Sequence, residues 1–459
     1  MAQNTLFKKI RRECEEKGTE YMTLLTLDLR GKLHSLNLPF RMFTPSLMGT
    51  GVGFDASSYG FSKAERSDMV MIPDLETYFY DPFSEKKTAV FMANIHLTNP
   101  ERTRFSQDVR YIIEKAKEAI IQAKIGTSVM VAPEYEFFIF ETADFGVDEE
   151  GCFYYLEKES TEKRNFYHSC SPDDLHLDFK NEATSILLDL GVPIKYHHHE
   201  VAVNQHEIET GFGDLLQSAD QAVMVKYVLF NLAKKYELFV TFMPKPFYGN
   251  AGSGWHVHQF VLDGLKNIFL NKNGYANFSK KGLAYITGML FHAQSLCALT
   301  SPSTNSYKRL VRGYEAPVAA IFAKSNRNAA IRIPTYAQPA ETRLEYRPGD
   351  ASANPYLALS AMVMAGVDGI LKNLKPEDFH FGPYDSGIPE SRALRKKIRM
   401  LPESLSEALD QLEKDHAYLK YGDVFSDKVI TQWLKIKRDE VDEMRYIPHP
   451  KEFELYFGF

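Results

Sequence analysis

The hydrophobic and polar positions in the first hundred residues predict a small unit rich in β-structure. Residues 6–17 combine apolar and charged positions at helical spacing. Two apolar runs, 21–29 and 33–38, then flank the sequence Arg-Gly-Lys, which predicts a β-hairpin. A stretch rich in loop formers and two further strand-like runs follow: residues 51–63, 68–81 and 87–97. We place the end of this unit near residue 104.

The rest of the chain predicts one large mixed region in which helices alternate with strand-like segments. No internal repeat or low-complexity linker divides it. Apolar positions at helical spacing predict helices at residues 107–124, 172–190, 214–236, 282–299, 354–371, 403–418 and 426–443. We therefore expect two domains, residues 1–104 and 105–459.

The most informative segment of the large region is the strand-like run 131–140, Val-Ala-Pro-Glu-Tyr-Glu-Phe-Phe-Ile-Phe. Successive side chains of a strand point to opposite faces, so Glu134 and Glu136 project from one face, and Tyr135 and Phe137 from the other. Two carboxylates this close in an apolar setting repel each other unless a cation or a proton compensates them, and their oxygens suit a hard divalent ion. The alternative is an edge strand with a solvated glutamate face.

Composition narrows the possible partners. The 459 residues carry a formal net charge of −6, and no basic run indicates nucleic-acid binding. The four cysteines include no C-x-x-C pair, which argues against a disulfide framework and a zinc knuckle: Cys14, Cys152, Cys170 and Cys297. Neither a signal-peptide core nor a run of about 20 apolar residues occurs. We expect a cytoplasmic protein without a membrane anchor that acts on small molecules or proteins.

A second acidic segment spans residues 196–209, Tyr-His-His-His-Glu-Val-Ala-Val-Asn-Gln-His-Glu-Ile-Glu. It adds Glu200 and Glu207, two carboxylates that could complete an oxygen site begun by Glu136. The three adjacent histidines look like a zinc tract. Alternate histidines of a strand face opposite ways, however, so packing is the alternative role for them.

A third segment places His256 and His258 on one strand face, directly after the flexible loop Gly252-Ser253-Gly254. These two histidines are candidates for the same site. A pair of half-buried strand histidines is the alternative.

The segment 304–347 supplies the basic residues of the predicted site. Arginines recur there in apolar or strand-like surroundings, which a solvated surface arginine does not need. Strand alternation places Arg343, Glu345 and Arg347 on one face. Guanidinium groups match phosphate and carboxylate oxygens, and divalent ions bridge phosphate oxygens in phosphoryl transfer. The constellation predicts a metal-nucleotide active site, although no Walker loop and no kinase motif occurs.

Many motifs follow one another in an order that matches a known family. They are Pro-Glu-Tyr-Glu-Phe-Phe (133–138), His-His-Glu-Val-Ala (198–202), Gln-His-Glu-Ile (205–208), Thr-Phe-Met-Pro-Lys-Pro (241–246), Gly-Ser-Gly-x-His-Val-His (252–258), Asn-Ser-Tyr-Lys-Arg-Leu-Val (305–311), Glu-Ala-Pro (315–317), Ile-Arg-Ile-Pro (331–334) and Ser-Ala-Asn-Pro-Tyr-Leu-Ala (352–358). Nearly end to end, the chain resembles the type I glutamine synthetases, the ATP-dependent glutamate-ammonia ligases of bacteria and archaea.

The resemblance implies an α+β fold. A small β-grasp-like N-terminal domain would precede a large catalytic domain, whose curved antiparallel sheet is flanked by helices. Twelve subunits would form two hexameric rings with active sites between neighbours.

In the implied reaction, ATP phosphorylates the γ-carboxylate of glutamate and ammonia attacks the resulting acyl phosphate. A lid is needed because water would otherwise hydrolyse that intermediate.

Position within the motifs also implies two divalent ions, Mg²⁺ or Mn²⁺, one orienting glutamate and the other the ATP phosphates. The implied ligands are Glu136, Glu200 and Glu207 for one ion, and Glu134, His256 and Glu345 for the other.

The same matching implies contacts to the substrates. The residues implied for ATP and the transferring phosphoryl group are His258, Arg327, Arg332, Arg343 and Arg347. Arg309 would pair with the α-carboxylate of glutamate, beside the loop at Gly252. Glu315 would close over the intermediate and help take a proton from the amine. Asp55 would reach into a neighbouring subunit's site and draw ammonium there, with Tyr167 in the same acceptor pocket.

The chain departs from the family at several places. Ala56 stands where many relatives have glycine, and Ala251 where they have the asparagine of the glutamate loop. Phe260 replaces a serine near the nucleotide. Residues 165–168, Asn-Phe-Tyr-His, replace Gly-Gly-Tyr-Phe around the ammonium pocket, so the amine acceptor is the least defined part of the site. The tyrosine loop used for adenylylation has no match in residues 372–384, and we expect no such regulation.

Two alternatives to glutamine formation stay open. One is a γ-glutamyl-amine ligase that accepts methylamine, ethanolamine or a polyamine in place of ammonia. The other is a catalytically silent paralogue that senses a ligand, against which stands the presence of all six implied metal ligands.

Overall fold

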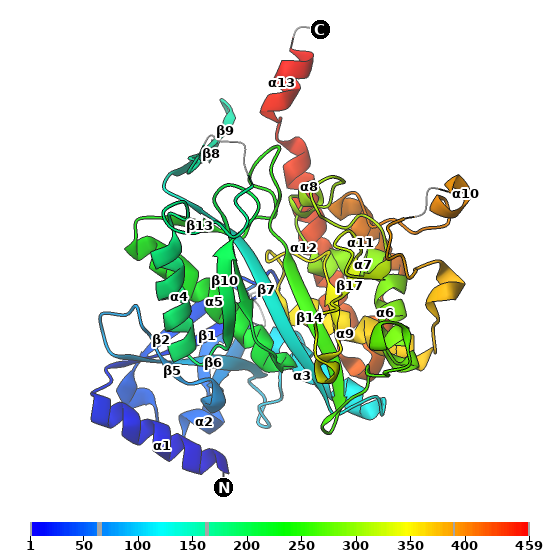
Figure 1. Cartoon of the computed structure of the whole chain (residues 1–459). Helices are drawn as coiled ribbons and strands as arrows, with labels where there is room; N and C mark the ends of the chain where they lie inside the picture. The colour runs from blue at the N-terminus through cyan, green and yellow to red at the C-terminus, as the bar shows by residue number, and fades with distance from the viewer. Residues whose placement is uncertain (1, 62–66, 161–164, 389–390, 458–459) are drawn as a thin grey trace.

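The computed structural model describes residues 2–61, 67–160, 165–388 and 391–457 (Figure 1). The N-terminal part is a six-stranded sheet in the order β2-β1-β6-β4-β3, with β5 paired to β6. Its helices and strands are α1 (Ala2–Lys17), β1 (Tyr21–Leu27), β2 (Leu33–Pro39), α2 (Leu47–Thr50), β3 (Val52–Asp55), β4 (Asp68–Pro73), β5 (Phe79–Tyr80) and β6 (Thr88–Leu97). Helix α1 covers one face and buries Phe7, Ile10 and Cys14 in a small core of its own.

The predicted hairpin is confirmed, because Leu27 pairs with Leu33 across its turn. Two other expectations for this part need correction. The stretch 51–63 is not all loop: Val52–Asp55 forms β3, since Val52 and Phe54 pack on the small core. The run 68–81 is not one strand, because β4 ends at Pro73 and a 3₁₀ turn (Leu75–Thr77) follows before β5. The Asp74 side chain accepts a hydrogen bond from the Glu76 amide, which favours that turn.

The larger part is built on a ten-stranded sheet in the order β10-β11-β7-β14-β18-β17-β16, with β12 and β13 on β7 and β15 on β14. Its strands are β7 (Ser128–Phe140), β10 (Ile194–His199), β11 (Gln205–Thr210), β12 (Gly213–Asp214), β13 (Phe239–Thr241), β14 (Trp255–Asp263), β15 (Lys266–Asn267), β16 (Phe322–Lys324), β17 (Ile331–Ile333) and β18 (Leu344–Tyr346). All its strand pairs are antiparallel except β16 with β17, so the expected antiparallel sheet is in fact mixed.

Helices flank this sheet and supply most of the main hydrophobic core. They are α3 (Val109–Gln122), α4 (Leu177–Asp189), α5 (Leu215–Lys235), α6 (Lys280–Phe291), α7 (Ala293–Thr300), α8 (Ser306–Arg309), α9 (Pro355–Leu371), α10 (Arg392–Arg395), α11 (Leu405–Lys414), α12 (Asp427–Tyr446) and α13 (Pro450–Tyr456). Shorter 3₁₀ segments lie at Phe40–Met42, Tyr275–Asn277, Pro339–Glu341, Pro376–Phe379 and Ala417–Asp423. Helix α9 is buried in this core from Pro355 to Val367, and its C-terminal end reaches the surface at Leu371.

The prediction of one helix over 282–299 is wrong. Helices α6 and α7 meet at an angle of 74°, and His292 lies at the break. Its imidazole bonds to Asp368 in α9 and to Asp415 after α11, at 2.9 and 2.8 Å. These bonds hold the break in place. Among the described residues, no single helix is long and apolar enough to cross a membrane; only the bent pair α6 and α7 meets that test, taken together.

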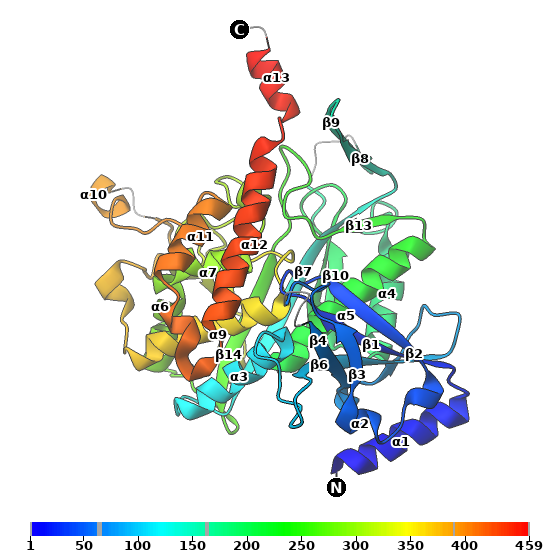
Figure 2. The ribbon, with the colours of Figure 1, turned by 180° about the vertical axis from the view of Figure 1, so that it is seen from behind.

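Two elements extend away from the body of the molecule. The hairpin of β8 (Ala143–Val147) and β9 (Cys152–Leu156) and the C-terminal helix α13 project from the same end (Figures 1 and 2). Both carry exposed large apolar side chains: Phe145, Val147, Phe153, Tyr154 and Tyr155 on the hairpin, and Phe453, Leu455, Tyr456 and Phe457 at the C-terminus. The N-terminal domain lies at the opposite end.

Candidate active site

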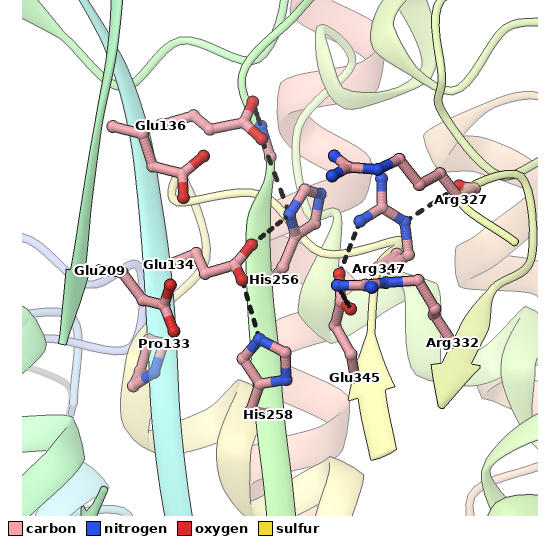
Figure 3. Close-up of polar contacts among 12 residues, drawn as sticks. Pro133, Glu134, Glu136, Glu209, His256, His258, Arg327, Arg332, Glu345 and Arg347 are labelled. Carbon is pink, nitrogen blue, oxygen red and sulfur yellow. Dashed lines mark hydrogen bonds and ion pairs between the residues drawn. The ribbon is translucent and has the colours of Figure 1, made fainter. Parts of the chain in front are cut away.

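Strand β7 is the centre of the site. It pairs with β11 on one edge and β14 on the other, and it carries Glu134 and Glu136 on the face away from the packed side chains of Tyr135 and Phe137. Figure 3 shows Glu134 and Glu136 facing the cavity from this strand. The strand alternation predicted from the sequence is therefore confirmed, whereas the alternative of a solvated edge strand is wrong.

One cluster joins Glu134, His256 and Glu345, whose possible ligand atoms lie within 4.8 Å of one another. Nδ1 of His256 lies 2.9 Å from Oε2 of Glu134, and Nε2 of His258 lies 2.8 Å from Oε1 of the same carboxylate. Burial alone would raise the pKa of Glu134, but hydrogen bonds with the two imidazoles hold that pKa well below its usual range. This carboxylate is therefore negatively charged.

Glu345 belongs to this cluster and is also paired with arginines (Figure 3). Arg347 donates a hydrogen bond from Nη1 to Oε1 of Glu345 at 2.6 Å, and Arg332 forms an ion pair with Oε2. Burial opposes ionisation of this fully enclosed carboxyl, yet Arg347 lowers its pKa below the ordinary value. The structure thus joins the acidic and the basic halves of the site through one side chain.

A second cluster joins His198, Glu200 and Glu207 on the other side of β7. Oε1 of Glu207 lies 3.7 Å from Nε2 of His198. Burial, with Glu136 and Glu207 nearby, raises the pKa of Glu200 to about 9. Burial also raises the pKa of Glu207, and the charges of Glu134 and Glu136 add to the effect. Among the described residues, His198 is the one ion-pair partner of these carboxylates and neither lysine nor arginine pairs with them, which is the electrostatic condition for binding a cation.

Glu136 lies between the two clusters. It accepts hydrogen bonds from the Gly254 amide at 2.7 Å and from Nε2 of Gln205 at 3.1 Å. Two glycines allow this close approach. A Cβ on Gly252 would lie 2.3 Å from the Pro244 carbonyl oxygen, and one on Gly254 would lie 2.5 Å from a guanidinium nitrogen of Arg309. Any larger residue at either position would therefore displace the loop.

These groups line a cavity of about 490 Å³. Most of the residues predicted for the site line it: Glu134, Glu136, Tyr167, Glu200, Glu207, Gly252, His256, Arg309, Glu315, Arg327, Arg332 and Arg347. Asp55, His258, Arg343 and Glu345 do not line it. The cavity wall is acidic on the side of β7 and β11 and basic on the side of β17 and β18 (Figure 3).

The arginines are held in different ways. Arg309 is buried and donates to the Pro348 and Gly349 carbonyls, both at 3.0 Å, which fixes its guanidinium beside His256 at 3.4 Å. Burial lowers its pKa. Arg327 is exposed at the cavity and interacts with the Tyr167 hydroxyl. Arg347 also donates to the Glu315 carbonyl oxygen at 3.4 Å, and Glu315 has a positive φ of 56°.

The predicted residues outside the cavity have clear positions. His258 is fully buried behind Glu134, with Nδ1 3.4 Å from Nε of Arg343, so in this structure it orients Glu134. Arg343 packs over Tyr336 and Phe212. Asp55 lies in the N-terminal domain, where hydrogen bonds from Ser57 lower its pKa to about 2.

Sequence reasoning missed several residues of the site. Glu209 lies beside Glu134 and His258, with one oxygen that has no hydrogen-bond partner among the described residues (Figure 3). The same alternation that selected Glu134 and Glu136 would have found it, two positions after Glu207. His198 turns toward the cavity while His199 packs on the other face, so the interpretation of alternating histidines is confirmed.

The departures from the family pattern also have positions. Phe260 is buried and packs edge-on against Phe212, with ring centroids 4.9 Å apart. Ala251 lines the cavity beside Gly252. Ala56 is buried in the main core.

Comparison with known proteins agrees with this geometry. Residues 106–456 match the family described as glutamine synthetase, catalytic domain, and residues 18–98 match glutamine synthetase, beta-Grasp domain. The chain belongs to the glutamine synthetase family. The resemblance seen in the motifs is confirmed, as is the α+β fold with a β-grasp domain before a large catalytic domain. The family supports a metal-dependent ligase.

Several relatives cover almost the whole chain. The glutamine synthetase of Aquifex aeolicus is 39% identical over 465 residues, covering 96% of this chain and 97% of its own. The 3-hydroxylaminophenol mutase of Cupriavidus pinatubonensis is 38% identical, covering 97% of each chain. Among solved structures, Plasmodium falciparum glutamine synthetase superimposes with a TM-score of 0.87 at 25% identity, covering 98% of each chain. GmaS in complex with ADP superimposes with a TM-score of 0.84 at 25% identity, covering 98% of this chain and 99% of its own.

Proposed function

We propose that this protein is an ATP-dependent ligase that forms glutamine from glutamate and ammonia through a γ-glutamyl phosphate intermediate. The observation that carries the proposal is the convergence of two acid-histidine clusters and four arginines around one cavity. Family membership adds to it, although a relative named as a mutase shows that the family alone does not define the reaction.

The donor sets fit Mg²⁺ or Mn²⁺, because carboxylate oxygens predominate and two of the carboxyls need a nearby cation to ionise. Glu134, His256 and Glu345 would hold one ion. Glu200 and Glu207, with Glu136 or His198, would hold the other. Such ions, when bound, neutralise phosphate charge and polarise the transferring group.

The protein's own side chains then perform defined tasks. Arg327, Arg332 and Arg347 face the carboxylate clusters, where their guanidinium groups would surround the γ-phosphoryl group as it passes from ATP to glutamate. Arg309, fixed by backbone carbonyls, would bind the α-carboxylate of glutamate beside Gly252. We assign His258 and Arg343 to the ATP-binding part of the site, where His258, bonded to Glu134, lies behind the carboxylate that faces the phosphates.

The second step needs a neutral amine and a dry site. The loop that carries Glu315 lines the cavity and bonds to Arg347 through its backbone, so its closure would exclude water from the acyl phosphate. The Glu315 carboxylate would take a proton from the attacking amine. Tyr167 would line the acceptor pocket together with the exposed Asp55 of a neighbouring chain.

This assignment of Asp55 requires an oligomer, because Asp55 does not line the cavity of its own chain. We propose a dodecamer of two hexameric rings. The exposed aromatic side chains on the β8–β9 hairpin and at the C-terminal end of the chain support assembly, since they gather on two projecting elements at one end of the molecule (Figure 2). Mass photometry should give twelve chains; a monomer would remove Asp55 from the reaction.

A second candidate is a γ-glutamyl-amine ligase. It is favoured by the aromatic wall of the cavity, to which Tyr167, Tyr196 and Tyr314 contribute, because aromatic faces suit organic ammonium groups. The deciding measurement compares kcat/KM for ammonia, methylamine, ethanolamine and putrescine with ATP and glutamate. A higher value for ammonia supports glutamine formation, and a much higher value for an organic amine supports the second candidate. Absence of ATP hydrolysis and of γ-glutamyl hydroxamate formation with Mg²⁺ or Mn²⁺ would overturn both.

A further inference from the structure

A buried cluster of three histidines and one glutamate lies on the far side of β10 and β11 from the cavity. His199 of β10 is paired in register with His206 of β11, and their ring centroids are 4.5 Å apart. His176 joins them from the segment before α4, and Glu159 from the segment after β9. None of the four lines the active-site cavity. Strand alternation separates the two sites, because His198 and Glu207 face the cavity while His199 and His206 face away from it.

The four side chains converge on the carboxylate of Glu159. Nε2 of His199 lies 3.4 Å from Oε2, and Nε2 of His206 lies 3.6 Å from Oε1. Nε2 of His176 lies 2.9 Å from Oε1, but without the geometry of a hydrogen bond. As a result, Nε2 of His176, Nε2 of His206 and Oε1 of Glu159 have no hydrogen-bond partner among the described residues. His199 and His206 are completely buried, so bulk solvent does not reach these atoms.

The hydrogen bond made by the other ring nitrogen of His199 determines which of the two nitrogens carries the proton of the neutral ring. Nδ1 of His199 lies 2.8 Å from the Glu200 carbonyl oxygen and must carry a proton there. In the neutral ring, Nε2 is then a lone pair that faces a carboxylate oxygen. Two lone pairs repel, so either a second proton or a metal ion must lie between them. The separations of 3.4 and 3.6 Å are close to the distance of about 3.3 Å between two ligands of a tetrahedral zinc ion.

We propose that Glu159, His199 and His206 bind a divalent transition-metal ion of the zinc class, with His176 lying beside the carboxylate of Glu159. Two imidazoles and one carboxylate favour Zn²⁺, Co²⁺ or Ni²⁺ over Mg²⁺, which prefers oxygen ligands. The ion ties the segment after β9 and the start of α4 to the hairpin that carries Glu200 and Glu207. Its role is structural, because none of its ligands reaches the cavity.

Lys180 is the nearest charged group, and its ammonium is already paired with Asp174 at 2.7 Å. Nζ of Lys180 also lies 3.2 Å from Nδ1 of His206. A metal ion on Nε2 would require the ring proton of His206 on Nδ1, and the ammonium of Lys180 would then bond to Asp174 alone. Asp174 has a second oxygen without a hydrogen-bond partner among the described residues, so it can accept this change.

The test uses the full-length protein, stripped with EDTA and titrated with Co²⁺ in a large excess of Mg²⁺. We expect one equivalent of Co²⁺ per chain that Mg²⁺ does not displace, with the intense visible absorption of tetrahedral Co²⁺. Zn²⁺ should displace it. Glu159→Gln and His206→Phe should each weaken this binding by at least about 100-fold.

The matched control is His197→Asn, on the same strand one residue before the cavity-facing His198, which should keep the tight equivalent. Circular dichroism and the native size of each variant show whether it has folded. The proposal is overturned if the wild-type protein binds no tight equivalent in excess Mg²⁺, which would leave a proton between Glu159 and His199. It is also overturned if folded Glu159→Gln binds Co²⁺ as tightly as the wild-type protein, or if His197→Asn loses the site equally.

Discussion

The two carboxylate clusters lie on either side of β7, but their charges are compensated in opposite ways. In the cluster of Glu134, His256 and Glu345, imidazoles and arginines neutralise the carboxylates, and the pKa values of Glu134 and Glu345 are lowered. In the cluster of His198, Glu200 and Glu207, carboxylates face other carboxylates, and the pKa values of Glu200 and Glu207 are raised. In the first cluster, protein groups compensate the carboxylate charges. In the second cluster, a cation or added protons must compensate them.

This difference separates two uses of a buried charge. A carboxylate already paired with arginine keeps that arginine in place, so Glu345 organises the guanidinium groups as well as offering an oxygen to an ion. A carboxylate surrounded by like charges stores unfavourable energy that a cation releases on binding. We therefore expect substitutions in the two clusters to have different consequences for activity, stability and pH dependence.

The largest effect should come from Glu345→Ala. The variant loses one oxygen of the first cluster and leaves Arg332 and Arg347 without their shared partner. We expect ATP-dependent γ-glutamyl hydroxamate formation to fall by about 1000-fold or more. Glu341→Ala is the matched control, because Glu341 is exposed and meets only the edge of Arg343 at 3.5 Å. Activity within tenfold of the wild type would show that Glu345 takes no part in catalysis, and the proposed difference between the two clusters would then be wrong.

Stability without divalent ions should change in opposite directions for the two clusters. Glu345→Gln should lower the free energy of unfolding by about 3 kcal/mol, because it leaves two buried guanidinium groups uncompensated. Glu200→Gln should raise it by about 2 kcal/mol, because the buried carboxyl no longer has to stay protonated or repel its neighbours. Urea unfolding of EDTA-treated protein measures both values. If the free energy of unfolding changes in the same direction in both variants, the carboxylate charges of the two clusters are not compensated differently.

The second cluster should also couple cation binding to protons. Because the pKa of Glu200 is about 9, against an ordinary value of 4.5, the ion-free folded protein holds a proton that the unfolded chain has released at neutral pH. Stability without ions should therefore fall as pH rises between these two values. A cation displaces that proton, so Mn²⁺ affinity should rise by about tenfold per pH unit, or about 100-fold between about pH 6 and about pH 8. Calorimetry in buffers of different ionisation enthalpy would measure the protons released, and Glu200→Gln should release fewer.

The smallest effect concerns His292, a buried group compensated by two aspartates outside the active-site cavity. Burial would lower the pKa of His292, but hydrogen bonds with Asp368 and Asp415 raise it above the usual value. Its stabilising contribution is present below about pH 6.5 and is lost as pH rises through the raised pKa. His292→Gln should therefore cost about 1 to 2 kcal/mol near about pH 6 and less in alkaline solution, with unchanged kcat. A constant cost at every pH would show that the ring is neutral.

The sequence predicts the parts of this site that depend on local geometry. The period of two residues in a strand places Glu134 with Glu136, and Arg343, Glu345 and Arg347, without knowledge of the fold. Their meeting depends on strand order, since β18 lies next to β14 and sets Glu345 opposite His258. Single-sequence periodicity holds no information on which strands are neighbours. The family resemblance supplied that arrangement.

The misses have physical causes too. The helical pattern of 282–299 continues across His292, but bonds to two distant aspartates bend the chain there, and such contacts leave no local signal. Strand alternation places Glu209 on the same face as Glu207, but it was not predicted for the site. A carboxylate at the end of an acidic run is usually exposed to solvent, and the sequence does not show that a neighbouring strand covers this one. The cluster around Glu159 was hidden for the same reason, as its members come from three separate segments.

Strand β7 is hydrogen-bonded to neighbouring strands along both edges, so its backbone is rigid. The interval between Glu134 and Glu136 is fixed by the strand repeat at about 7 Å, and neighbouring strands prevent it from stretching. An enzyme built this way accommodates ions of different radius by rotating side chains, leaving the sheet still. Structures with Mg²⁺ and with the larger Mn²⁺ should then superimpose in backbone and differ in the torsion angles of the glutamates alone.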